Sequence, residues 1–167
     1  MNPTIVTDPE KYKKGWHGGL PETPCGYGSR FHQTKIQRKW IPEMVAKYDI
    51  SSIADIGAGD LNWSARTAFG CEYTPYDLIP RAQGVTEFNL LTDELPDADC
   101  LMVLWVINHF PPKEQAIAMG KLLRSTSRYL IMTFDKRMEK ETDLTYLDKA
   151  VLRHDRGIDF EIRLIQL

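Results

Sequence analysis

Residues 53–64 read IADIGAGDLNWS, and the expected fold follows from this stretch. Ile53–Ile56 is a short, mostly apolar run that is typical of a buried strand. Gly57 and Gly59 end the run, and because glycine has no Cβ, the backbone there can come close to a ligand. Residues 61–68 can then begin a helix. A strand, a glycine turn and a helix in this order predict a nucleotide-sized pocket at the carboxyl end of the first strand.

Two carboxylates in this stretch indicate which ligand would fit. A dinucleotide pocket places a pyrophosphate on the N–H groups of a helix N-terminus and avoids negative charge there. Here Asp55 lies on the strand and Asp60 in the turn, where both would repel a pyrophosphate. They suit a cofactor with an amino group and a sulfonium, which favours S-adenosylmethionine (SAM) over NAD. A tight connection that binds no ligand is the simpler alternative.

The composition narrows the class of protein. A chain of 167 residues with 43% hydrophobic and 26% charged residues suits one globular domain. A net charge of −2 gives no general electrostatic reason to bind nucleic acid or an anionic membrane. Three cysteines far apart, with no CxxC pair, favour a reducing compartment over a disulfide framework, and we expect no metal site. With no signal-like start and no long apolar span, we expect a cytoplasmic protein.

The first 29 residues are rich in proline and glycine and show no sustained periodicity. They predict an irregular arm or lid, ahead of a single domain over residues 30–167. A cluster of lysines and aromatic residues over residues 11–17 could contact a phosphate or a base, but a solvated arm is the favoured interpretation. Ser29 could cap the next helix, which the apolar spacing predicts over residues 30–48. Pro42 lies inside that pattern, so a kink or break is expected near Ile41.

Further along the chain, strand and helix patterns alternate. Residues 72–77 predict a second strand that ends on Asp77, about 20 residues beyond the glycines, where a carboxylate can accept both ribose hydroxyls of an adenosine. A solvent-exposed acid at a strand end is the alternative. A third strand over residues 85–89 ends at Asn89, which with Leu90 could contact an adenine.

The second half of the chain completes the predicted sheet. Residues 99–106 are the most apolar run and predict a central buried strand, followed by a helix over 113–124 and a strand over 128–134. This alternation predicts a Rossmann-like, three-layer α/β sandwich with a mostly parallel sheet. The tail over residues 144–154 leaves two alternatives open. Leu144, Leu147 and Val151 could lie on one helix, or residues 150–154 could pair with residues 158–167 across a turn at residues 155–157 as a closing antiparallel hairpin. The alternation of apolar and charged residues from Ile158 to Leu164 favours the hairpin.

The order of these parts resembles a class I SAM-dependent methyltransferase. The resemblance depends on D-x-G-x-G at residues 55–59, the acid Asp77, Asn89-Leu90 at a strand end, and a fourth strand leading to Asn108-His109-Phe110. More specifically, GYGS at residues 26–29 followed by GDLNW at residues 59–63 looks like a small subgroup found in bacteria and their viruses. The similarity covers residues 26–134, and GDLNW is its most specific part.

The resemblance also implies a role for each matching residue. His109 would be the catalytic base for a hydroxyl acceptor, and Trp105 would help to line the pocket, although Leu104-Trp105 replaces a charged pair expected there. In the subgroup pattern, Gly28, Ser29 and Arg38 would hold the cofactor carboxylate or close the site. The remaining implied cofactor contacts are Asp55, Gly57, Gly59 and Asp60 at the methionine end, Asp77 at the ribose, and Asn89 and Leu90 at the adenine.

The sequence therefore predicts methyl transfer from SAM to a small-molecule or nucleotide-like acceptor. No N/D-P-P-Y/F string is present near residue 110, which disfavours a DNA adenine methyltransferase and makes a nucleic-acid partner unexpected. Two other classes stay open. One is a catalytically inert SAM-fold binding or regulatory module, suggested by Leu104-Trp105. The other is an NAD-dependent oxidoreductase, which the acid in the glycine loop disfavours.

Overall fold

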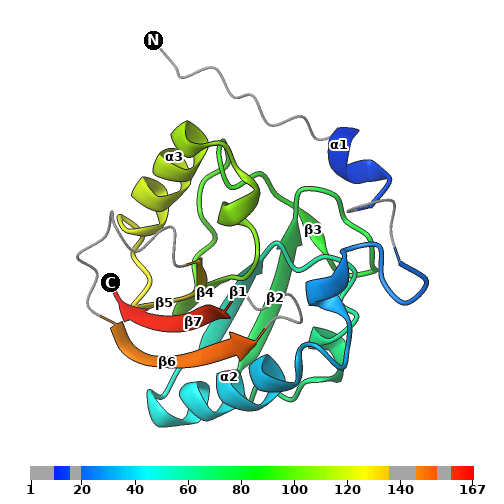
Figure 1. The fold of residues 1–167 in the computed structure, drawn as a ribbon. Coiled ribbons are helices and arrows are strands. Elements are labelled where there is room, and N and C mark those ends of the chain that lie inside the picture. Colours follow the sequence, from blue (N-terminus) through cyan, green and yellow to red (C-terminus); the bar gives the residue numbers. More distant parts are fainter. Residues whose placement is uncertain (1–9, 16–19, 136–145, 154–158) are drawn as a thin grey trace.

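A sheet of seven strands forms the centre of the molecule. The computed structural model describes residues 10–15, 20–135, 146–153 and 159–167, and within them the strand order is β3-β2-β1-β4-β5-β7-β6 (Figure 1). Neighbouring strands from β3 to β5 are parallel, whereas β7 is antiparallel to both β5 and β6. The strands are β1 (Ser52–Ile56), β2 (Glu72–Asp77), β3 (Thr86–Glu87), β4 (Cys100–Val103), β5 (Tyr129–Asp135), β6 (Tyr146–Arg153) and β7 (Asp159–Gln166).

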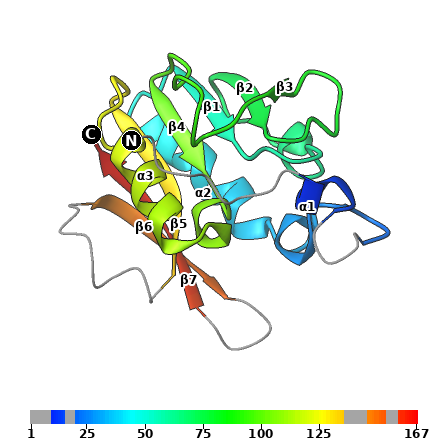
Figure 2. The ribbon, with the colours of Figure 1, turned by 90° about the horizontal axis from the view of Figure 1, so that it is seen from above.

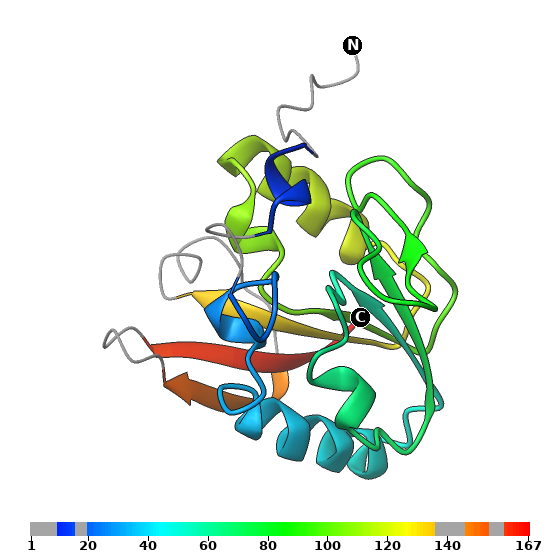
Figure 3. The ribbon, with the colours of Figure 1, turned by 90° about the vertical axis from the view of Figure 1, so that its right-hand side faces the viewer.

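One helix covers each face of this sheet, as Figure 3 shows, with α3 (Pro112–Leu122) on one side and α2 (Lys35–Lys47) on the other. Successive side chains of a strand point to opposite faces, so the two buried clusters divide each strand between them. Ile53 and Met102 pack on the α2 side, whereas Ala54 and Leu101 pack on the α3 side. The expected Rossmann-like three-layer sandwich, mostly parallel with an antiparallel closing strand, is confirmed.

The structure corrects the expected bounds of the first long helix. α2 begins at Lys35 rather than Arg30, and it continues through Pro42 without the expected break. Its buried face, which includes Trp40 and Ile41, packs against the sheet and offsets the backbone hydrogen bond that proline cannot donate. Ser29 does not cap this helix, because it lies in a separate 3₁₀ turn, Tyr27–Ser29, and its hydroxyl donates to the Cys25 carbonyl.

The prediction of a helix directly after the glycine turn is also wrong. Only a single 3₁₀ turn, Ser64–Arg66, forms between β1 and β2. Leu61 has a φ of 59°, which is outside the helical region, so the chain cannot continue from the turn directly into a helix. No α-helix lies in the described connections between β1 and β4, so the expected alternation of strand and helix fails there although the strands remain parallel.

The tail of the chain forms the favoured hairpin. β6 and β7 pair antiparallel, which excludes the alternative helix over residues 146–153. β6 starts at Tyr146, earlier than expected, and the predicted turn at residues 155–157 lies outside the described residues.

A short helix, α1 (Glu10–Lys13), is the one regular α-helical element in the described part of the predicted irregular arm. Figures 1 and 2 show α1 beside the β2–β3 side of the sheet, away from the β6–β7 hairpin. Trp16 and His17 of the lysine-aromatic cluster lie outside the described residues. Within the described residues, no helix is both long enough and apolar enough to span a membrane.

Candidate cofactor and acceptor pocket

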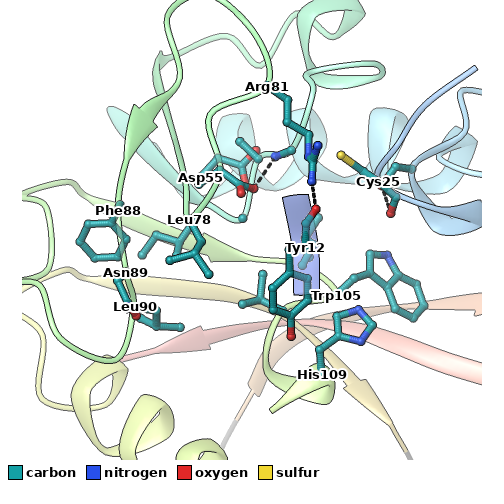
Figure 4. Close-up of a pocket in the computed structure, with 18 of the residues that line it drawn as sticks. Tyr12, Cys25, Asp55, Leu78, Arg81, Phe88, Asn89, Leu90, Trp105 and His109 are labelled. Atoms are coloured by element: carbon teal, nitrogen blue, oxygen red, sulfur yellow. Dashed lines mark hydrogen bonds between the residues drawn. The ribbon is translucent and has the colours of Figure 1, made fainter. Parts of the chain in front are cut away.

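A pocket opens where β1, β2 and β4 end, because parallel strands bring the loops after their carboxyl ends to the same edge of a sheet (Figure 4). The N-terminal segment supplies a further wall. The lining residues are Tyr12, Pro24, Cys25, Ser29, Asp55, Ile56, Gly57, Ala58, Gly59, Trp63, Asp77, Leu78, Arg81, Phe88, Asn89, Leu90, Leu91, Leu104, Trp105, Val106, His109 and Phe110.

The glycine turn after β1 is packed against other parts of the protein. Gly57 and Gly59 have φ values of 89° and 66°, which favour glycine. A Cβ on Gly57 would lie 2.2 Å from Val106 Cγ2, and a Cβ on Gly59 would lie 2.7 Å from Cys25 Sγ. The absence of a Cβ at these two glycines therefore leaves room for Val106 and Cys25. From the sequence, the same absence was expected to leave room for a ligand. Through these contacts the loop after β4 and the N-terminal segment meet at the turn.

Asp77, at the end of β2, holds this turn in place. Its Oδ2 accepts a hydrogen bond from the Gly59 amide at 2.8 Å, and its Oδ1 accepts one from the Ile79 amide at 2.9 Å. Burial nevertheless raises the pKa of the Asp77 carboxyl, because the loss of water outweighs these two N–H groups. The structure thus places Asp77 in the pocket wall rather than in open solvent.

Asp55, on β1, is the most deeply buried acid of the pocket and is only 3% exposed. Its Oδ2 accepts a hydrogen bond from the Tyr73 hydroxyl. Burial raises the pKa of the Asp55 carboxyl to about 7, and the nearby Asp77 charge adds to this effect. Because two acids lie at this end of the pocket, a cationic group would be favoured there.

A more apolar wall follows β2 and β3. Phe88 packs edge-on against Tyr76, with ring centroids 5.7 Å apart. The amide oxygen of Asn89 accepts a hydrogen bond from the Leu91 N–H at 3.0 Å, and the Asn89 N–H donates to Asp93 at 2.8 Å. The side-chain oxygen of Asn89 therefore already has one backbone partner and retains one lone pair for a further donor.

The segment after β4 forms the opposite wall. Trp105 has a φ of 61°, a left-handed conformation that costs a bulky residue about 1–3 kcal/mol. It is held there by packing against Phe160, with ring centroids 4.6 Å apart, and by its backbone N–H, which donates to the Thr133 hydroxyl at 3.3 Å. His109 ends the following 3₁₀ turn, Ile107–His109, and lines the pocket with Phe110. Backbone strain of this kind often marks a functional site.

The two motifs of the sequence resemblance meet in space. Asn62 of GDLNW donates from Nδ2 to the Ser29 carbonyl of GYGS at 3.0 Å and to Glu22 at 2.9 Å. Glu22 also accepts from the Phe31 amide at 2.7 Å and from Arg30 at 3.2 Å. These donors, the Phe31 amide first, lower the pKa of Glu22 to about 2. Glu22 and Asn62 thus connect the N-terminal segment to the glycine turn.

Three of the expected site residues are not part of the pocket lining. Gly28 lies behind Trp105, and a Cβ added there would be 3.8 Å from the indole. Arg38 stacks over the Phe31 ring at 3.6 Å and donates to the Phe31 carbonyl at 3.2 Å. Asp60 accepts from the Asn62 amide at 3.3 Å. The other expected residues line the pocket, namely Ser29, Asp55, Gly57, Gly59, Asp77, Asn89, Leu90, Trp105 and His109.

Several lining residues were missed by sequence reasoning, above all Tyr12 and Arg81. The Arg81 guanidinium donates to the backbone carbonyls of Tyr12 and Lys13 and so holds α1 at the pocket. Figure 4 shows the Tyr12 ring between Arg81 and His109. The sequence offered only a weak signal, the aromatic residues of the arm, because the contact joins residues that are far apart in the chain. Among the described residues no cluster of three or more His, Cys, Asp or Glu side chains could hold a metal ion.

Comparisons with known proteins indicate the fold. No protein-family model and no curated protein sequence matches the chain. Magnesium protoporphyrin IX methyltransferase from Synechocystis, solved with SAM, has a TM-score of 0.57 at 14% identity over 81% of this chain and 80% of its own. The 1,6-didemethyltoxoflavin-N1-methyltransferase from Burkholderia thailandensis has a TM-score of 0.59 at 11% identity over 77% of each chain. The methyltransferase domain of bacterial CtHen1 has a TM-score of 0.58 at 11% identity over 81% of this chain and 100% of its own.

The packing of the turn predicts that Gly57→Ala destabilises the protein by about 3 kcal/mol, because it adds backbone strain and a clash with Val106. Gly28→Ala is the matched control and should change stability by less than about 1 kcal/mol, since its new methyl group makes an ordinary contact. Denaturant unfolding measures both. Adding Val106→Ala to Gly57→Ala should recover part of the loss, and equal stability of the two glycine variants would contradict this account.

The raised pKa of Asp55 predicts a pH dependence of stability. The folded protein holds the Asp55 proton more tightly than the unfolded chain, whose ordinary pKa is 3.8. This stabilising contribution is fully present below that value and is lost as the pH rises through about 7. We expect the Asp55 contribution to the free energy of unfolding to fall across this window, by at most about 1.4 kcal/mol per pH unit.

Urea unfolding of Asp55→Asn at several pH values tests this expectation. Asparagine does not titrate but can still accept the Tyr73 hydrogen bond, so the variant should show a shallower decline. Glu43→Gln, at an exposed position of α2, should keep the wild-type slope. If Asp55→Asn and the wild type have the same slope, the pKa of Asp55 is not raised.

Proposed function

We propose that this chain, which has the fold of class I SAM-dependent methyltransferases, binds SAM and transfers a methyl group to a small-molecule acceptor. The observation that carries the proposal is the carboxylate of Asp77 at the end of β2. Each of its oxygens has accepted one backbone N–H and retains a lone pair for a further donor. A carboxylate at this place suits the two hydroxyls of an adenosine ribose.

The other lining residues fit the remaining parts of SAM. Asp55, which lines the pocket together with the glycine turn and Ser29, would favour the positively charged methionine end, since a cation would lower the pKa of that buried acid. Phe88, Asn89 and Leu90 would receive the adenine, two of them as apolar surface. In this proposal Gly28, Arg38 and Asp60 act indirectly, by supporting the Trp105 indole, the Phe31 backbone and the glycine turn. The arm, with α1, would be a lid over the site.

The reaction needs little covalent help from the protein. When bound, SAM supplies a methyl group whose bond to sulfur breaks, with the electron pair staying on sulfur, as an acceptor lone pair forms the new bond. The chain would hold the two reactants in line and exclude water. This positioning can lower the activation free energy by several kcal/mol. For a hydroxyl acceptor, His109 would take the proton as general base. A His109→Gln protein with normal cofactor binding and unchanged methylation of such an acceptor would contradict that role.

Two other classes are separated from this proposal by the same pocket. NAD would bring a pyrophosphate to a site that presents Asp55 and Asp77, so tighter binding of NAD than of SAM would favour an oxidoreductase instead. A non-catalytic SAM-binding module would bind the cofactor and transfer no methyl group to any acceptor that fits the pocket.

We also propose a cytoplasmic setting. The structure supports it through its free thiols, since none of Cys25, Cys71 and Cys100 is in a disulfide. Unpaired cysteines are typical of proteins in reducing compartments. The protein is taken from its natural cell without reductant and then denatured for thiol titration. All three thiols should be found reduced, and an intermolecular disulfide would contradict this setting.

Calorimetric titration with SAM and S-adenosylhomocysteine tests the cofactor proposal. We expect binding of both, and we expect Asp77→Asn to weaken it by about 10- to 100-fold, since a hydrogen bond to a charged group contributes about 1.5–3 kcal/mol. Glu43→Gln is the control for loss of a carboxylate away from the pocket. Thermal unfolding of Asp77→Asn separates lost contacts from a lost fold. Absence of binding to the folded wild type would overturn the proposal.

A further inference from the structure

The end of the pocket nearest His109 is walled by aromatic rings. Tyr12 comes from α1, whereas Trp105, His109 and Phe110 come from the segment after β4. The Trp105 ring packs edge-on against Phe160, with ring centroids 4.6 Å apart, and Gly28 lies on another side of the indole. Aromatic walls that are fixed before a ligand arrives favour flat aromatic ligands, because rings stack or pack edge-on with little loss of side-chain freedom.

The charges that line the pocket are unfavourable for an anion. Asp55 and Asp77 lie at the glycine turn, and the buried Glu114 is close enough to Tyr12 that its charge helps to raise the pKa of that phenol, after burial. Among the described lining residues Arg81 is the one arginine, and no lysine is present. The Arg81 guanidinium is already bound to the carbonyls of Tyr12 and Lys13.

A phosphate in this pocket would therefore lie among carboxylates, and Arg81, the one arginine of the described lining, already donates hydrogen bonds to the Tyr12 and Lys13 carbonyls. Binding sites for phosphates normally supply paired guanidinium or ammonium groups or a helix N-terminus. The pocket also has a strained, rigid wall at Trp105, which is suited to one shape of ligand rather than to a flexible chain. These features separate two acceptor classes that the sequence left open.

We infer that the acceptor is a flat aromatic molecule, carrying a hydroxyl or amino group and no phosphate, that binds between Tyr12 and the Trp105–Phe110 wall. This inference rests on the proposed methyl transfer, since the ring must lie beside the cofactor site and within reach of His109. It assigns Tyr12 a role in acceptor specificity, as a ring delivered by the N-terminal arm. The inference disfavours phosphorylated nucleotides as acceptors, because their phosphates would lie among the carboxylates of the pocket.

Three related probes test the inference by calorimetric titration of the full chain saturated with S-adenosylhomocysteine. 2-Naphthol is flat and uncharged, 2-naphthyl phosphate is flat and anionic, and decahydro-2-naphthol is uncharged but not flat. We expect 2-naphthol to bind about tenfold more tightly than either of the others, which corresponds to one or two aromatic contacts or one unfavourable charge interaction. Tighter or equal binding of 2-naphthyl phosphate, or no binding of 2-naphthol, would overturn the inference.

Two variants locate the binding site. Tyr12→Leu should weaken 2-naphthol binding by about three- to tenfold through loss of one ring contact. Tyr146→Leu, at an exposed position on β6, should leave it unchanged. Equal effects of the two variants would contradict the placement beside Tyr12. Binding of S-adenosylhomocysteine is measured first in each protein, so failure of the cofactor proposal is recognised separately from failure of the acceptor inference.

Discussion

The hydrogen bond from the Gly59 amide to the Asp77 carboxylate is the contact on which the pocket depends. It joins the turn after β1 to the end of β2 at 2.8 Å, and the neighbouring amides of Gly57 and Ala58 donate to the Tyr76 carbonyl. With the turn fixed in this way, the absence of a Cβ at its two glycines lets other segments pack closely against the backbone. Val106 and Cys25 occupy those places, so the loop after β4 and the N-terminal segment are positioned by the same turn.

The pocket contains features that lower the stability of the protein on its own. Asp55 is buried with its pKa raised to about 7, and the pKa of Asp77 is raised as well, chiefly by burial. Trp105 adopts a backbone conformation that is unfavourable for a large side chain. Buried acids and backbone strain collected at one edge of a sheet are typical of a site whose ligand offsets their cost. Binding of a cation beside Asp55 would provide such an offset.

The N-terminal segment forms part of the pocket border, at a place where no α-helix lies within the described strand connections. The described connections between β1 and β4 contain no α-helix, so loops alone border this part of the pocket. Glu22 and Asn62 attach residues 22–31 to the glycine turn, and Arg81 attaches α1 to the loop after β2. The arm is therefore bound to the edge of the sheet at two separate places, and it brings Tyr12 to the pocket.

The sequence by itself determined the order of the strands along the chain, the acids at the ends of β1 and β2, and the closing hairpin. These features follow from local patterns: apolar runs, glycines after a strand, and strict alternation from Ile158 to Leu164. The exact range of β2 and the position of Asp77 at its end were predicted for the same reason.

Only the tertiary structure decided how the pocket is walled. The helix expected after the turn fails at Leu61, whose backbone the surrounding loop holds outside the helical region, and α2 passes through Pro42 because its apolar face is buried on the sheet. Arg38 has the expected motif position but contacts Phe31, and Tyr12 reaches the pocket without any motif. Such contacts join residues far apart in the chain, and their free energy depends on burial and distance in the folded protein, which no local pattern records.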